Sequence, residues 1–200
     1  TTDLSLTMTA ESCNVIRAVS VGVSASGTVA GTASGLGNVI HNTLTSMVTG
    51  STVTAVGSVS LSANDIAPSY IPEWMLPEDK KEDLNTALED SPIDLDTNIL
   101  AILVSVSGSG TVAVSGTLTG NVIINVITAN VVDSEVHSTG GSVSLDASTD
   151  SGIIALTVGV GGSGAVAVSA SGFGNVITNT IEAMIEEFST ATAAGAVLIA

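Results

Sequence analysis

An internal repeat restricts the fold of this chain more than any other feature of the sequence. The hexapeptide GNVIHN at residues 37–42 returns as GNVIIN at 120–125 and as GNVITN at 174–179, with only its fifth residue free to change. Two further markers, Ser-Gly-(Thr/Ala)-Val-Ala and Gly-(Ser/Ala)-Val, recur in the same order. They begin at Ser26, Ser109 and Ser163 and at Gly57, Gly141 and Gly195. Recurrence at a fixed spacing is typical of proteins that stack equivalent units.

The spacing of the markers locates one insertion. The second and third copies lie 54 residues apart for every marker (163 − 109, 175 − 121, 195 − 141), whereas the first and second lie 83, 83 and 84 apart. The excess of 29 (83 − 54) falls after Gly57. Residues 65–96 account for it, because they hold all four prolines, the single Trp and Tyr, both lysines and ten of the nineteen acidic residues. Pro77-Glu78-Asp79 predicts the start of a short helix that ends near Leu88.

The hexapeptide and the residues after it read as a strand, although the third copy also fits a helical stripe. In each copy one alternate set of residues is held constant in type, as in Asn38, Ile40 and Asn42, and the other set varies. Position five of the hexapeptide, His41, belongs to the varying set and is Ile124 and Thr178 in the other copies. Alternation of this kind predicts an inward and an outward strand face. The inward asparagines are expected to satisfy one another in stacked ladders.

These observations predict an all-β fold: a β-solenoid-like stack of three repeats of about 54 residues, with one inserted Pro-rich, partly helical excursion. We expect a single repeat domain over 1–200, with repeats at about 4–64, 97–147 and 148–200 and the insertion at 65–96. Each repeat should hold about four short strands, and 54 residues could form two or three coils. A closed three-fold β-barrel or prism is the alternative, because three repeats could close instead of stacking.

The residues at the two ends of the chain occupy the same positions within the repeat as internal strands do. Residues 4–10 align with 141–147 at an offset of 137 (163 − 26), and residues 195–200 have the phase of 57–62. A stack without polar caps exposes strand edges, so we expect neighbouring repeats or subunits to continue the array through these strands.

Three long segments, 18–64, 97–132 and 151–181, contain no Asp, Glu, Lys or Arg. Gly, Ser and Thr interrupt every apolar run, so none of the segments resembles a membrane-spanning helix. We expect uncharged faces packed within protein instead. Strands such as TVAVSG at 111–116 are expected to be covered on both faces, and the Ser-Gly pairs before them to form tight turns.

The net charge of −16, with only Arg17, Lys80 and Lys81 as basic residues, makes nucleic acid and anionic membranes improbable partners. The single cysteine, Cys13, cannot form a disulfide within the chain.

The sequence assigns no catalytic, cofactor-binding or metal-binding residue. His41 and His137 occupy variable positions, and Cys13 has no neighbouring histidine. The run from Asp94 to Asn98 imitates the start of a calcium loop but lacks the Gly and the Glu that complete it. Aromatic stacking on a sugar could involve only Tyr70 and Trp74 of the insertion.

The residues that recur at 109–148 and 163–185, SGTVAVSG…GNVIINVITANVVDSEVHSTGGSVSLDAS and SGAVAVSASGFGNVITNTIEAMI, resemble the repeats of large bacterial filamentous surface adhesins, the leukotoxin-like and filamentous-haemagglutinin-like proteins. The resemblance covers all three repeats and leaves out the insertion. It implies a β-solenoid-like stalk at the cell surface or beyond, without an active site.

We therefore expect a structural and adhesive repeat module, extracellular or on the bacterial surface, that associates end to end through its edge strands. Another surface protein, or a host or abiotic surface, is a further expected partner. A module that binds calcium, a glycan or ice is the alternative. An enzyme acting on polysaccharides on a β-helix is a third class, but its convergent acids and bases are not apparent. The threonines Thr7, Thr9, Thr117 and Thr119 do not align between copies as an ice-binding face requires.

Overall fold

The computed structural model describes residues 4–68 and 97–200, which form thirteen β-strands and no helix. The first coil comprises β1 (Leu6–Ser12), β2 (Ile16–Ser26), β3 (Val29–Thr49) and β4 (Thr52–Ala55). The second comprises β5 (Val59–Asp65), β6 (Ile99–Ser109), β7 (Val112–Val132) and β8 (Glu135–Ser138). The third comprises β9 (Val143–Thr149), β10 (Ile153–Ser163), β11 (Val166–Glu186) and β12 (Thr190–Ala193), and β13 (Val197–Ile199) begins the next turn. The expected helix within 77–88 lies outside the described residues.

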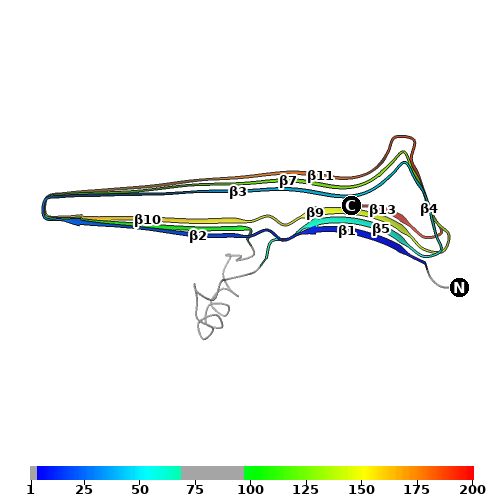
Figure 1. The fold of residues 1–200 in the computed structure, drawn as a ribbon, viewed down its shortest axis with the longest axis horizontal. Helices are drawn as coiled ribbons and strands as arrows, with labels where there is room; N and C mark the ends of the chain where they lie inside the picture. Colours follow the sequence, from blue (N-terminus) through cyan, green and yellow to red (C-terminus); the bar gives the residue numbers. More distant parts are fainter. Residues whose placement is uncertain (1–3, 69–96) are drawn as a thin grey trace, which may run out of the picture.

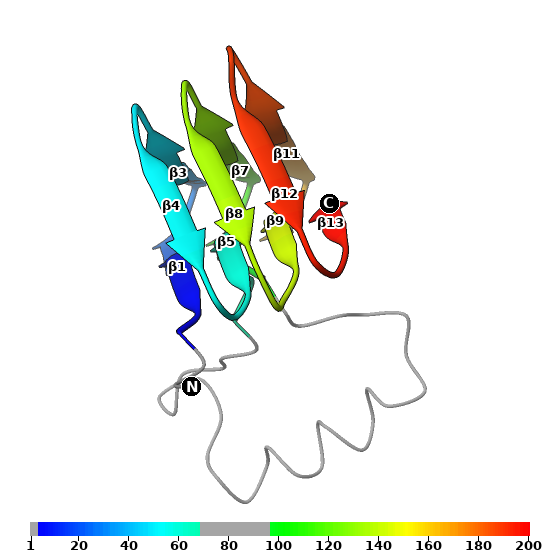
Figure 2. The same ribbon diagram turned by 90° about the vertical axis from the view of Figure 1, so that its right-hand side faces the viewer.

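Equivalent strands of successive coils pair in parallel and build four sheets, in the orders β1-β5-β9-β13, β10-β6-β2, β11-β7-β3 and β12-β8-β4. The register places the repeat markers beside one another, as Ser26 beside Ser109 and Asn38 beside Asn121. Figure 2 shows the coils side by side along the stack. The fold is therefore all-β with stacked parallel sheets, and the repeats do not close into a barrel or prism.

One repeat forms one coil, which corrects the expectation of two or three coils of short strands. The strand through the hexapeptide is 21 residues long in every coil, and the glycines before the asparagines do not interrupt it. The chain reverses at the Ser-Gly turn between β2 and β3, as expected, and turns again around β4. The cross-section is consequently long and flat (Figure 1).

The coil has two parts that differ in thickness (Figure 1). In the part that ends at the Ser-Gly turns, β2, β6 and β10 run close beside the first halves of β3, β7 and β11; we call this part the arm. In the other part the layers diverge, and β1, β5, β9 and β13 with β4, β8 and β12 enclose a wider interior, which we call the wide half.

Most of the hydrophobic core lies in the wide half, and a smaller cluster of Ile40, Ile99, Ala101 and Ile123 lies where the wide half meets the arm. The largest cluster includes Leu61, Ile127, Val131 and Leu145, all fully or almost fully buried. The alternation predicted from the sequence is confirmed in the first two coils, where Ile40 and Ile123 point inward while His41 and Ile124 point outward. Branched aliphatic residues at alternate positions fill this space and exclude water from it.

The arm is thin because its inward residues are small. A Cβ added to Gly22 of β2 would lie 2.5 Å from Ser34 Oγ and 2.5 Å from Thr32 Cγ2 of β3, so the two layers are already in contact there. In the second coil the inward Ser115 Oγ donates to Ser105 O at 3.0 Å. The expectation that strand 111–116 is covered on both faces is wrong, since its outward Val114 is 45 % exposed.

Candidate functional site: polar ladders and the open ends of the stack

The titratable residues that the sequence brought forward do not converge. His41 faces outward on β3, Cys13 is exposed between β1 and β2, and His137 on β8 shares a hydrogen bond through Nδ1 with Thr192 Oγ1 of β12. Among residues 4–68 and 97–200, no three His, Cys, Asp or Glu side chains are grouped so that they could hold a metal ion.

The calcium-like run and the two aromatic residues of the insertion fall mainly where the structure gives no description: Asp94, Asp96, Tyr70 and Trp74 lie outside the described residues. Asn98, the last residue of the run, is fully buried and joins three coils. Its Nδ2 donates to Asn14 O at 3.0 Å, and its Oδ1 accepts from the backbone N–H of Gly152 at 3.1 Å. These bonds give Asn98 a structural role.

Two of the threonines weighed for an ice-binding face point into the molecule. Thr117 and Thr119 are 5 % and 2 % exposed, on the inward side of β7. They therefore cannot contribute to a flat outer surface of the kind that ice binding requires.

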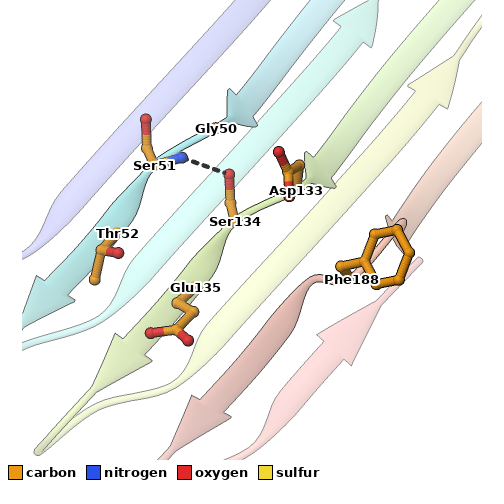
Figure 3. Close-up of a pocket in the computed structure, with 7 residues that line it drawn as sticks. All are labelled: Gly50, Ser51, Thr52, Asp133, Ser134, Glu135 and Phe188. Carbon is orange, nitrogen blue, oxygen red and sulfur yellow. Dashed lines mark hydrogen bonds between the residues drawn. The ribbon is translucent and has the colours of Figure 1, made fainter.

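A shallow depression of about 240 Å³ lies at the corners that lead from the long strands into β4 and β8, and Figure 3 shows the side chains that line it. It is lined by Gly50, Ser51, Thr52, Asp133, Ser134, Glu135 and Phe188. Gly50, Asp133 and Phe188 have positive φ angles of 56°, 46° and 56°, which make the sharp corner. Its two carboxylates, Asp133 at the corner and Glu135 at the start of β8, are exposed to water, and Phe188 is 99 % exposed. The depression presents no enclosed apolar surface for a ligand.

The asparagines of the hexapeptide form the most ordered polar feature of the molecule. Asn38 Nδ2 donates to Asn121 Oδ1 at 2.7 Å, and Asn121 Nδ2 donates to Asn175 Oδ1 at 2.8 Å. Asn121 is fully buried, so its donor and its acceptor are both satisfied by the coils on either side. The expected ladder is therefore present, and it runs along the stack.

This ladder has a direction. Each amide donates to the coil that follows it in the sequence, so the described stack ends in an acceptor without a donor at Asn38 and a donor without an acceptor at Asn175. A further coil above Asn175 would complete the series only if it presented an acceptor, as Asn38 does.

A second ladder surrounds a buried carboxylate that the sequence did not single out. Asn42 Nδ2 donates to Asn125 Oδ1 at 3.0 Å, and Asn125 Nδ2 donates to Asn179 Oδ1 at 3.1 Å. The same two amides donate to Asp65, at 3.0 Å to Oδ1 and 3.1 Å to Oδ2. Asp65 is the last residue of β5 and is 2 % exposed.

Among the described contacts, every hydrogen-bond donor to this carboxylate is uncharged. Thr149 Oγ1 and Ser151 Oγ donate to Asp65 Oδ2 at 3.3 Å and 3.4 Å. Burial raises the pKa of Asp65 above its usual value, and the hydrogen bonds from Ser12, Thr149, Ser151 and Asn125 offset part of that rise. Its acidity and position predicted that Asp65 belongs to the insertion; its alternation with Val59, Leu61 and Ala63 is the sequence signal that could have indicated an inward side chain.

The two ends of the stack differ in exposure. In the last coil, Ile177 and Ile181 are 43 % and 44 % exposed, against 6 % and 7 % for the equivalent Ile40 and Leu44 of the first coil. The end formed by β10 and β11 therefore opens the interior, whereas the end formed by β2 and β3 presents mainly strand edges. Both ends leave backbone groups of edge strands without a partner strand in the described structure.

No helix in the described part of the chain is long and apolar enough to cross a membrane. Comparison with known proteins gives no match: no family model, no curated protein and no solved structure is similar to this chain.

Proposed function

We propose that this chain is a structural and adhesive repeat module of an extracellular or bacterial cell-surface protein, and that its terminal strands extend it end to end into a filament or stalk. The observation that carries the proposal is the Asn38–Asn121–Asn175 ladder, which ends in an unused acceptor at one end and an unused donor at the other. A coil added head to tail continues both the ladder and the parallel sheets.

Head-to-tail joining also agrees with the exposure of the ends. The half-exposed Ile177 and Ile181 would be covered by the first coil of the next unit, as Ile123 and Ile127 are covered within the stack. Strand addition to an open sheet edge supplies main-chain hydrogen bonds, and the in-register inward side chains supply specificity. Contact between unlike ends that repeats the translation along the stack does not close into a ring, and it therefore generates a filament.

The experiment compares two neighbouring residues of β11. Ile181→Lys places a charge on the inward side of the open coil, whereas Thr180→Lys places the same charge on the outward side. Electron microscopy and sedimentation velocity of the 200-residue protein should show rods for the unchanged chain and for Thr180→Lys, and only short species for Ile181→Lys. Compact particles of the unchanged chain at every concentration, or equal assembly by both variants, would contradict end-to-end extension.

A further inference from the structure

The outer surface of the arm formed by β2, β6 and β10 is an uncharged apolar grid. Its outward residues lie in register as the rows Val19-Ile102-Leu156, Val21-Val104-Val158 and Val23-Val106-Val160. We call this surface the arm grid. Most of its residues are well exposed, and Val21 and Val23 reach 65 % and 73 %. Contiguous apolar surface of this regularity is uncommon on a protein that works alone in water.

The inside of the arm toward the Ser-Gly turns is polar, whereas Ile99, Ala101 and Leu103 of β6, nearer the wide half, are buried apolar residues. Between the layers lie small polar residues such as Ser105, Ser107 and Ser115, which are almost fully buried. The hydroxyls of Ser107, Ser109, Thr119 and Ser163 are buried without a hydrogen-bond partner in the described structure. In that part of the arm, folding of the isolated coil buries hydroxyls and leaves larger aliphatic side chains such as Val21 and Val23 in water. Covering the arm grid would add the apolar burial that this part of the coil lacks.

The described charged residues lie away from the arm grid along the length of the coil. The described acidic residues all belong to the wide half, its corners or its junctions; they are Glu11, Asp65, Asp133, Glu135, Asp146, Asp150, Glu182, Glu186 and Glu187. Arg17 lies at the end of β2 next to the wide half, and its guanidinium donates to Thr97 O at 2.8 Å. From Ala18 to the Ser-Gly turn, and in the equivalent stretches of the other coils, no residue is charged.

We propose that the arm grid binds the arm grid of a second copy of this chain, with the two arms antiparallel and a two-fold axis parallel to the stack. In this orientation the described acidic residues of the two wide halves lie at opposite ends of the pair, so the two copies meet through surface whose described residues are uncharged. Sheets that pack face to face align their strands and interdigitate rows of side chains, for which the Val rows provide a regular lattice.

The direction of the two-fold axis follows from stacking. An axis parallel to the stack keeps both copies running the same way, so each coil of one copy faces the equivalent coil of the other. The area is three strands about 4.8 Å apart by 11 residues of about 3.3 Å, or about 500 Å² per copy. A stable interface buries about 800 Å² per partner, so three coils give a weak pair and every further coil strengthens it.

The test uses the Ile181→Lys protein, in which end-to-end joining does not contribute to association. A failure of the end-to-end proposal is therefore distinguishable from a failure of the arm-grid proposal. Sedimentation equilibrium should show a concentration-dependent dimer. Val104→Glu, at the centre of the arm grid, should weaken the dimer at least about tenfold, because a buried carboxylate would have no partner. Val126→Glu on the outward side of β7 is the matched control and should leave it unchanged, and circular dichroism should show that all three proteins retain their β-structure.

The orientation is tested by spin labels at the tips of the arms. Gly27→Cys in a Cys13→Ser background labels the turn, where an added Cβ meets nothing within 4 Å. Antiparallel arms place the two labels about 36 Å apart, the length of an 11-residue strand, whereas parallel arms bring them together. A short label distance would overturn the proposed orientation.

Four other results would overturn the proposal. The Ile181→Lys protein could remain monomeric at every concentration, or dimerise equally well with Val104→Glu. It could dimerise only after deletion of residues 69–96, which would indicate that this segment covers the arm grid. It could bind vesicles of zwitterionic phosphatidylcholine through the arm grid in place of a second copy.

Discussion

Asn125 donates its side-chain amide to Asp65 at 3.1 Å in the interior of the stack, and Asp65 is the buried carboxylate around which the second ladder is organised. The two residues are 60 positions apart in the sequence and belong to different sheets. Their contact exists because each repeat forms a full coil, so that the end of β5 meets the middle of β7.

Replacing Asp65 should remove a pH dependence of stability. Burial raises the pKa of Asp65 in the folded protein above the value in the unfolded chain. Its contribution to stability is therefore fully present below the unfolded pKa and is lost as the pH rises through the folded pKa. Urea unfolding from pH 3 to pH 8 should show that Asp65→Asn gains stability relative to the unchanged protein as the pH increases. A stability difference between the two proteins that stays the same at every pH would contradict the raised pKa of Asp65.

Breaking the first ladder at its centre should destabilise the stack. Asn121→Ala leaves the Asn38 amide without its acceptor and the Asn175 carbonyl without its donor, and we expect a loss of about 1–3 kcal/mol in the free energy of unfolding. Val122→Ala alters the outward neighbour and should cost less than about 1 kcal/mol. Equal losses for the two variants in urea titrations would show that the ladder contributes no stability.

The thinness of the arm predicts opposite effects for two glycines. Gly22→Ala should destabilise by about 1–3 kcal/mol, because the added Cβ would meet Ser34 and Thr32 at 2.5 Å and force the layers apart. Gly37→Ala points into open space and should be neutral or stabilise by up to about 1 kcal/mol, since it reduces the freedom of the unfolded chain. Thermal unfolding followed by circular dichroism measures both, and a tolerant Gly22→Ala would contradict the close approach of the layers.

The core of the wide half should respond to truncation on one strand face only. Ile127→Ala removes a fully buried side chain and should cost about 2–5 kcal/mol. Ile124→Ala, three residues earlier on the outward side of the same strand, should cost far less, because part of its side chain already contacts water. Similar midpoints for the two variants in guanidinium chloride would contradict the observed alternation.

Much of the strand geometry could be read from the sequence because it depends on local periodicity. The spacing of 54 residues, the inward asparagines and the turns at the Ser-Gly pairs all follow from comparison of the copies. The hydrogen bond from Asn38 to Asn121 is a consequence of that spacing, since equivalent residues of a stack must meet.

The sequence could not predict the number of coils, the position of Asp65 or the uncovered surface of the arm. Asp65 follows the regular strand pattern, but its acidity assigned it to the insertion, and only the packing of β5 against β7 places it inside. The uncharged segments were expected to lie within protein, yet Val21 and Val114 face outward in the described structure. Alternation defines two faces of a strand but not which of them another layer covers.

The amino-acid sequence by itself determined that this chain is a stack of equivalent parallel β-units with one insertion, because the repeat and the alternation of inward and outward residues are encoded locally. The tertiary structure alone decided the shape of the coil and the contacts within it. The distance between layers depends on the side chains that meet across the interior: Gly and Ser bring the layers together in the arm, and Val, Ile and Leu hold them apart in the wide half.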